Sequence, residues 1–158
     1  MRADPEATRS AGGRRSATLR VLVADDEAAI RLLCRVNLGL AGMEVIEAPD
    51  GAAAVALARS ERPDLILLDV MMPSVDGWEA AAAIAEDPST RDIPIVFLTA
   101  RSELADQRRG MEAGAVAYLT KPFDPVRLPP FLEGLLERVE RGARDRIRAE
   151  QLEALGGV

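Results

Sequence analysis

The chain has 158 residues, 48% of them hydrophobic, and a formal net charge of −6. This length suits one well-filled domain, and the acidic balance disfavours a general nucleic-acid binder, so we expect no direct contact with nucleic acid. No apolar run approaches the roughly 18 residues of a membrane span, so no membrane contact is expected either. Cys34 is the only cysteine, which excludes internal disulfides and predicts a cytoplasmic location.

Residues 1–17 are rich in Gly, Ser, Arg and Ala without an apolar period, which predicts a disordered leader. Five short apolar runs then alternate with helix-like segments. The predicted strands are residues 19–24, 43–48, 64–68, 93–98 and 115–119; five helices follow them, the fourth near 103–113 and the fifth beginning close to Pro130. Because right-handed crossovers make such strands parallel, the pattern predicts an α/β fold with a doubly wound parallel sheet.

Polar side chains stand at the carboxyl ends of several of these runs. They are Asp25 and Asp26 after the first run, Asp69 at the end of the third, Thr99 after the fourth and Lys121 just beyond the fifth. The carboxyl ends of parallel strands meet at one edge of a sheet, where ligands bind. One acidic residue after a strand is more often a helix cap. The convergence of several polar residues instead favours a single site with three carboxylates, one hydroxyl and one ammonium.

This set of groups indicates phosphoryl chemistry. Three converging carboxylates repel one another and need a cation, and their all-oxygen donors indicate Mg²⁺. The ammonium of Lys121 and the hydroxyl of Thr99 suit phosphate oxygens. Asp69 is the natural nucleophile, because its strand should be central, and its in-line attack on a phosphoryl group would form an aspartyl phosphate.

Four segments resemble the receiver domain of two-component response regulators: VLVADDE, LILLDVMMPSVDGWE, VFLTA and AYLTKPF, in the family's order and spacing. The resemblance covers roughly residues 19–139. It implies the flavodoxin-like, chemotaxis-type receiver fold with strand order 2-1-3-4-5. It also implies a signalling switch rather than an enzyme, phosphorylated on Asp69 by a histidine kinase or a histidine phosphotransfer protein.

The resemblance further implies how the metal is held. Asp26 and Asp69 would bind Mg²⁺ together with the backbone carbonyl of Met71, and Asp25 would help largely through water. The side chains of Met71 and Arg101 would stand beside the water that attacks the aspartyl phosphate. Neither is a base for water, so both predict a long-lived phosphoryl group.

The resemblance implies a switch at the next two strand ends. Thr99 and Lys121 would contact the phosphoryl group, and Lys121-Pro122 would be a cis peptide. Tyr118 matches the switch aromatic, which turns inward in the family when the threonine moves towards the phosphate. An ordinary strand aromatic is the alternative interpretation of Tyr118.

One departure from the family concerns the output surface. Receivers of winged-helix transcription factors usually carry acidic residues before the switch aromatic and basic partners on the last helix. Here those places hold Val116 and Ala117, with Phe131 and Gly134 on the helix. An apolar surface of strand five and helix five, used for a downstream protein target or for self-association, is therefore the prediction.

The expected boundaries are a receiver domain over residues 18–139 and a charged helical extension over residues 140–158. Opposite charges four residues apart, such as Glu140 with Arg144, favour a solvated helix there. A charged tail without a partner is the alternative.

Three other functions remain open. The chain can be the regulatory receiver of a larger transcription factor or signalling enzyme. A Mg²⁺-dependent phosphatase of the haloacid dehalogenase type also uses a strand-end aspartate, but it is expected to carry a second aspartate where this chain has Met71. A receiver that has lost phosphorylation is disfavoured, because no site residue is missing.

Overall fold

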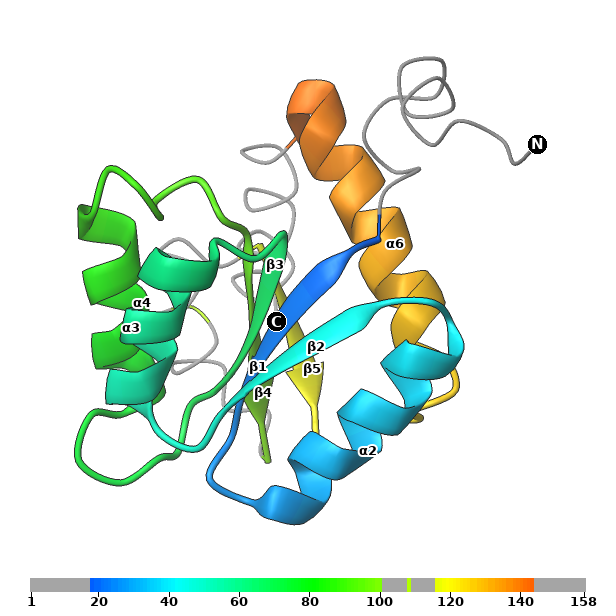
Figure 1. The fold of residues 1–158 in the computed structure, drawn as a ribbon, viewed down its shortest axis with the longest axis horizontal. Coiled ribbons are helices and arrows are strands. Elements are labelled where there is room, and N and C mark those ends of the chain that lie inside the picture. The colour runs from blue at the N-terminus through cyan, green and yellow to red at the C-terminus, as the bar shows by residue number, and fades with distance from the viewer. Residues whose placement is uncertain (1–17, 101–107, 109–115, 144–158) are drawn as a thin grey trace.

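The computed structural model describes residues 18–100, 108 and 116–143, which form one parallel sheet with helices on both faces (Figure 1). The strands are β1 (Arg20–Ala24), β2 (Glu44–Ala48), β3 (Leu65–Asp69), β4 (Ile95–Thr99) and β5 (Ala117–Thr120). They lie in the order β2-β1-β3-β4-β5, and each neighbouring pair is parallel. The predicted doubly wound sheet and its strand order are confirmed.

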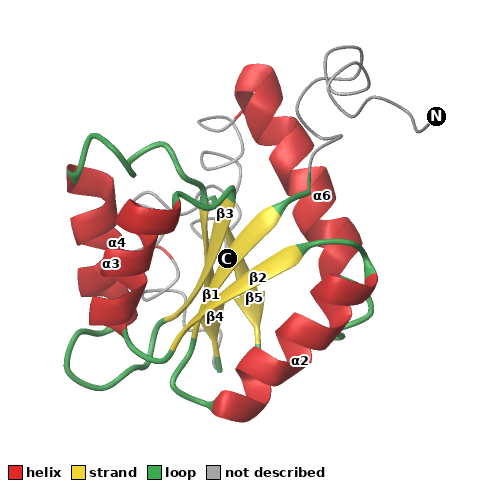
Figure 2. Cartoon of the chain, in the orientation of Figure 1, coloured by secondary structure: helices red, strands yellow, loops and turns green. Residues whose placement is uncertain are grey.

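Among the residues that the structure describes, the helices cover the two faces of the sheet in pairs (Figure 2). The helices α2 (Ala28–Leu40) and α6 (Leu128–Arg138) lie on one face, and α3 (Gly51–Glu61) and α4 (Gly77–Glu86) lie on the other. Successive side chains of a strand point to opposite faces, so Val21 and Val23 of β1 pack in the core under α2 and α6, whereas Leu22 packs in the core under α3 and α4. A sheet buried on both faces explains why its central strands are apolar along most of their length.

Side-chain caps begin the two helices of the α3 and α4 layer. Asp50 accepts a hydrogen bond from the backbone N–H of Ala53 at 2.8 Å. Asp76 accepts one from the N–H of Glu79 at 2.9 Å, and the Glu79 side chain accepts one from the N–H of Asp76 at 3.1 Å, which completes a capping box. These caps set where each helix starts after its loop.

Three strands, β3, β4 and β5, run one residue further than predicted. The predicted ends at residues 68, 98 and 119 are wrong, because the backbone of Asp69 still pairs with Leu98 and that of Thr99 with Thr120. A polar side chain at a strand end does not prevent backbone pairing. Asp69 and Thr99 are therefore held by the sheet itself rather than by the loops that follow.

The last described helix, α6, begins at Leu128 with Pro129 and Pro130 in its first turn. Backbone N–H groups in the first turn of a helix have no partner within the helix, so the missing N–H of a proline there costs no hydrogen bond. The predicted start close to Pro130 is confirmed. After α6 a single wider turn (Val139–Ala143) contains Gly142 at φ 78°, so the helix does not continue regularly.

Three predictions fall wholly or largely outside the described residues. They are the leader over residues 1–17, the helix near residues 103–113 and most of the extension over residues 140–158. Within the part of the chain that the structure describes, no helix is long and apolar enough to cross a bilayer.

Candidate functional site

Three carboxylates meet at the carboxyl ends of β1 and β3. Asp25, Asp26 and Asp69 each offer one oxygen, and these oxygens all lie within 4.8 Å of one another. Asp25 and Asp69 are buried, at 0% and 3% exposure, whereas Asp26 is exposed. The structure thus brings together the three acidic residues that the sequence predicted to share a site. An all-oxygen donor set of this kind fits a hard divalent cation such as Mg²⁺.

Backbone contacts hold Asp25 in place. Its N–H donates to the carbonyl of Ala48 at 3.1 Å, which extends the pairing of β1 with β2. Its Oδ1 accepts from the N–H of Glu27 at 2.9 Å, and its carbonyl accepts from the Arg31 guanidinium at 2.6 Å. The loop between β1 and α2 is therefore fastened from both sides of the carboxylate.

The last residue of the central strand β3 is Asp69. Its Oδ1 accepts from the N–H of Met71 at 3.2 Å. Behind it stands Gly77, the first residue of α4: a Cβ there would meet the carbonyl oxygen of Asp69 and would come within 2.7 Å of the Val70 Cα. The start of α4 packs against the backbone of Asp69 so closely that only glycine fits.

Lys121 reaches the same place from the end of β5. Its Nζ lies 2.8 Å from Asp25 Oδ2, 3.5 Å from Asp69 Oδ2 and 3.4 Å from Glu27 Oε1. Its backbone N–H donates to the carbonyl of Thr99 at 2.7 Å, and the peptide bond to Pro122 is cis, as the resemblance implied. One ammonium therefore contacts two buried carboxylates and one exposed carboxylate.

The electrostatics of the site follow from this crowding. Burial, followed by the charge of Asp25, raises the pKa of Asp69 to about 7, although Lys121 opposes the shift. Burial alone would lower the pKa of Lys121, but its hydrogen bond to Asp25 and the charges of Asp69 and Asp25 outweigh burial and raise that pKa. Without a cation the site holds more negative charge than Lys121 alone can neutralise, which is the condition that favours binding a divalent metal.

The predicted switch residues lie next to this cluster. Thr99 is buried, at 8% exposure, one strand away from Asp69. Tyr118 is half-buried, and its ring lies 5.6 Å from that of Phe97, which in turn lies 4.8 Å from that of Trp78. An aromatic series thus connects β5 through β4 to the first turn of α4.

Met71 and Arg101 are the two residues predicted to control the lifetime of the phosphoryl group, and the structure describes the first of them. The Met71 side chain is 72% exposed, beside the carboxylate cluster in the loop after β3. Arg101 lies outside the described residues.

Two site residues were missed from the sequence. Glu27 contacts Lys121, and its only signal in the sequence is that it continues the acidic pair. Gly77 stands behind Asp69, and in the sequence it reads as an ordinary turn glycine after Asp76.

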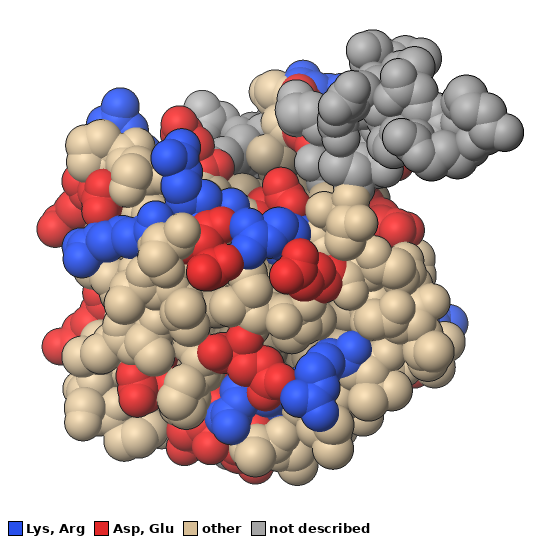
Figure 3. Space-filling model, in the orientation of Figure 1, with Lys and Arg blue, Asp and Glu red and all other residues tan. Residues whose placement is uncertain are grey.

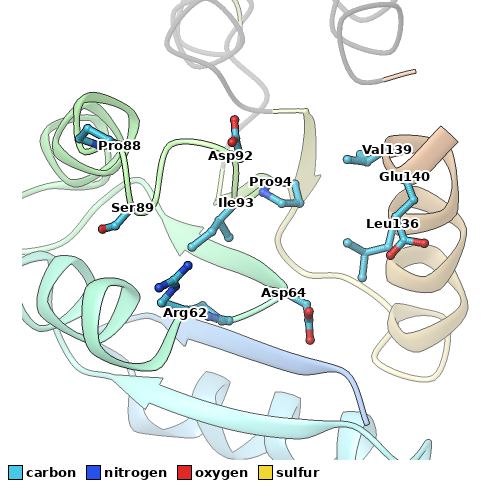
Figure 4. A pocket seen from close by; sticks show the side chains of 11 residues that line it. Arg62, Asp64, Pro88, Ser89, Asp92, Ile93, Pro94, Leu136, Val139 and Glu140 are labelled. Atoms are coloured by element: carbon cyan, nitrogen blue, oxygen red, sulfur yellow. The ribbon is translucent and has the colours of Figure 1, made fainter. Parts of the chain in front are cut away.

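A polar hollow of about 510 Å³ lies at the other end of the sheet, away from the carboxylates (Figure 4). Its lining includes Arg62 and Asp64 before β3, Pro94 before β4, and Leu136 and Val139 at the end of α6. None of the candidate site residues lines it, so it is a separate feature.

Charges of both signs are interspersed on the surface. On the face seen in Figure 3, basic and acidic side chains lie beside one another rather than in patches of one sign. Surface ion pairs join Arg35 to Glu47 at 2.7 Å and Arg59 to Asp87 at 2.7 Å. That face carries no broad basic patch.

Comparisons with known proteins agree with this geometry. A family profile for the response regulator receiver domain matches residues 21–133. The chain is 43% identical over 122 residues to the DNA-binding dual master transcriptional regulator RpaA of Synechocystis sp., covering 77% of this chain and 51% of that protein. It is also 43% identical over 122 residues to the phosphate regulon transcriptional regulatory protein PhoB of Pseudomonas aeruginosa, covering 77% of this chain and 53% of that protein. The chain therefore spans about half the length of these curated relatives.

A solved structure matches over nearly its whole length. The chemotaxis protein CheY4 of Vibrio cholerae superposes with a TM-score of 0.72 at 35% sequence identity, covering 75% of this chain and 99% of that one. Together with the profile match and the strand order, this shows that the chain belongs to the response regulator receiver domains of two-component systems, a family of regulatory phosphoacceptor domains.

Proposed function

We propose that this receiver works as a phosphorylation-dependent switch whose phosphoacceptor is Asp69. The observation that carries the proposal is the position of its carboxylate: buried at the end of the central strand, within 4.8 Å of two further carboxylates and 3.5 Å from the Lys121 ammonium. The donor is the phosphohistidine of a histidine kinase or of a histidine phosphotransfer protein, since such proteins serve this family.

The chain's own residues supply most of what the transfer needs. Asp69 attacks the phosphorus in line, a bond forms between its carboxylate oxygen and phosphorus, and the phosphorus–nitrogen bond of the donor breaks. Lys121 and Thr99 contact the oxygens of the transferred group and neutralise part of their charge. Asp25, Asp26, Asp69 and the backbone carbonyl of Met71 would hold Mg²⁺, which supplies further positive charge at those oxygens.

The switch runs through Thr99 and Tyr118. Thr99 lies on β4 beside Asp69 of β3, so a phosphoryl group on Asp69 offers its hydroxyl a new partner. Movement of Thr99 frees space towards which the half-buried ring of Tyr118 can turn. The ring contact of Tyr118 with Phe97 passes the change on to the core under α4.

The output leaves through the face formed by β5 and the start of α6. A hollow of about 490 Å³ lies there, lined by Leu119, Phe123, Leu128 and Phe131 and bordered by Asp124 and Arg127. Phe131 is 37% exposed, so the hollow and this ring together form a continuous apolar surface. A downstream protein target or a second copy of this chain would cover this face.

Two contexts for the domain have support. The match to CheY4 over 99% of that chain favours a receiver that acts by itself. The match to about half of two transcriptional regulators favours the regulatory receiver of a larger protein. A cytoplasmic location suits both, and it fits a lone buried cysteine with no disulfide partner in the chain.

To test the proposal, the purified chain is incubated with Mg²⁺ and phosphoramidate or acetyl phosphate, and the mass of the intact protein is measured by mass spectrometry. One phosphoryl group should be added to the wild type and none to Asp69→Asn. Incorporation by Asp69→Asn at the wild-type level would overturn the assignment. Steady release of phosphate from a phosphomonoester, over many turnovers, would point to the phosphatase instead.

A further inference from the structure

Glu27 is a fourth carboxylate at the site, and it differs from the other three in where it points. Its Oε1 accepts a hydrogen bond from Lys121 Nζ at 3.4 Å, whereas it does not belong to the group of acidic residues whose oxygens converge. Its side chain is 62% exposed, compared with 14% for Lys121. Glu27 therefore carries its negative charge on the solvent side of Lys121.

The backbone of Glu27 is fixed, so this charge has a defined place. Its N–H donates to Asp25 Oδ1 at 2.9 Å, and its carbonyl accepts from the N–H groups of Ile30 and Arg31 at 3.1 and 3.2 Å. Glu27 occupies the cap position of α2, but its side chain makes no capping hydrogen bond. The side chain has no role in starting the helix, and it contacts Lys121 instead.

The charge of Glu27 lies near the path by which a phosphoryl donor reaches Asp69. Asp69 is 3% exposed, and the ammonium of Lys121 contacts both Asp69 and the more exposed Glu27. In-line attack requires the leaving group of the donor to lie on the side of phosphorus away from Asp69, which is the solvent side. The leaving group therefore departs past Lys121 and through the field of the Glu27 carboxylate.

Donors differ in the charge of that leaving group. In phosphoramidate and in protonated phosphohistidine the phosphorus–nitrogen bond breaks and its electron pair goes to a nitrogen that carries positive charge before the transfer, so ammonia or neutral imidazole leaves. In acetyl phosphate the phosphorus–oxygen bond breaks, its electron pair goes to oxygen, and acetate leaves as an anion. A nearby carboxylate attracts the cationic nitrogen of the first kind of donor before the transfer, and it repels the anionic leaving group of the second kind.

We propose that Glu27 determines donor selectivity: its carboxylate favours phosphoryl donors whose phosphorus-bound nitrogen is cationic before the transfer over anionic acyl phosphates. This inference rests on the proposed phosphorylation of Asp69. It adds the class of phosphoryl donor that the charge beside the site favours. Glu27 acts through its charge at the mouth of the site and is not itself a nucleophile or a ligand of the transferred group.

The test compares the initial rates of phosphorylation by acetyl phosphate and by phosphoramidate at saturating Mg²⁺, in the full chain, for wild type and Glu27→Gln. The ratio of the acetyl phosphate rate to the phosphoramidate rate should rise about three- to tenfold in Glu27→Gln, the size expected for one unit charge near a protein surface. Glu27→Lys should raise the ratio further, and added salt should shrink both effects because it screens exposed charges. Glu27→Asp, which keeps the charge, should stay near the wild-type ratio.

Glu44→Gln is the matched control. The Glu44 side chain is 58% exposed, close to the 62% of Glu27, but it lies at the first residue of β2 beside Arg20, at the opposite end of the sheet. Removing that charge should leave the ratio unchanged. Thermal unfolding of each variant shows whether the fold is kept.

Three outcomes would overturn the inference. If both rates change by the same factor in Glu27→Gln and Glu27→Lys, Glu27 only restrains Lys121 and does not select donors. If the ratio changes equally in Glu44→Gln, the effect is one of net charge. If neither donor phosphorylates the wild type, the proposed function fails and this inference fails with it, whereas a phosphorylated wild type with unchanged ratios in the variants removes this inference alone.

Discussion

The ammonium of Lys121 lies closer to Asp25 than to Asp69: the distances from Nζ are 2.8 Å to Asp25 Oδ2 and 3.5 Å to Asp69 Oδ2. These two aspartates stand at the ends of the neighbouring strands β1 and β3, and Lys121 follows β5 at the edge of the sheet. The lysine therefore serves as the internal counter-ion of both buried carboxylates. This arrangement explains how the fold tolerates two acidic groups that are 0% and 3% exposed.

Replacing Asp26 by Asn should weaken Mg²⁺ binding roughly tenfold or more, since a loss of about 1.4 kcal/mol of interaction changes affinity tenfold. Asp26 is exposed, so the substitution should leave the fold intact. Calorimetric titration with Mg²⁺ measures the affinity. Glu133→Gln, which removes an exposed carboxylate on α6, should bind Mg²⁺ as the wild type does. Equal affinity in Asp26→Asn would remove this residue from the metal site.

Stability without metal should depend on pH through Asp69. Its carboxyl has an ordinary pKa of 3.8 and a pKa of about 7 in the folded protein, so the folded state retains its proton over a range in which the unfolded chain has lost it. Stability from this group is therefore present below about pH 4 and is lost as the pH rises to about 7. Asp69→Asn lacks this loss, so its advantage in free energy of unfolding over the wild type should grow by roughly 1–3 kcal/mol from pH 4 to pH 7.

Urea unfolding in the presence of a chelator, at several pH values, measures this difference. Saturating Mg²⁺ should reduce the advantage, because the cation stabilises the ionised carboxylates that the Asn variant lacks. An advantage that is constant across this pH range would contradict the raised pKa of Asp69.

Met71→Asn should shorten the lifetime of the phosphorylated protein several-fold. The Met71 side chain is 72% exposed next to the cluster, and an amide in its place can position the attacking water where a thioether cannot. Loss of phosphate is followed after the donor is removed. Leu40→Asn exchanges another exposed apolar side chain, 83% exposed at the end of α2, and should leave the lifetime unchanged. A lifetime unaltered by Met71→Asn would mean that this side chain does not control access of water.

Gly77→Ala should lower the free energy of unfolding by about 1–3 kcal/mol, the usual cost of forcing an extra carbon into a packed place. The new Cβ would meet the Asp69 carbonyl and stand 2.7 Å from the Val70 Cα, so slower phosphorylation should accompany the loss of stability. Gly39→Ala provides the contrast: a Cβ there has no neighbour within 4 Å, and alanine in α2 should stabilise by roughly 0.5–1 kcal/mol. Equal stability of Gly77→Ala and wild type, measured in urea, would show that the α4 start can move away.

The sequence predicts the sheet and most of the cluster because both depend on short-range patterns. Apolar runs give the strands, and the parallel order then brings Asp25 and Asp69 to the same edge. The ends of β3 and β4 were misjudged, because backbone pairing continues through the polar residues Asp69 and Thr99. The contact of Glu27 with Lys121 was beyond reach, since it depends on the conformations of two long side chains that no periodicity records.

The turn after α6 decides how this domain can influence anything attached to it. Leu136 and Val139 line the hollow beside Asp64 and Pro94, which precede β3 and β4, so the chain leaves the described domain at the amino ends of the strands. The candidate site occupies the carboxyl ends, one strand length away, which is roughly 17 Å for five residues. A segment attached after residue 143 therefore begins near the amino ends of the strands, where it makes no direct contact with Asp69. A signal from phosphorylation would therefore reach that segment through a change in how α6 packs on the sheet and how β5 pairs with it.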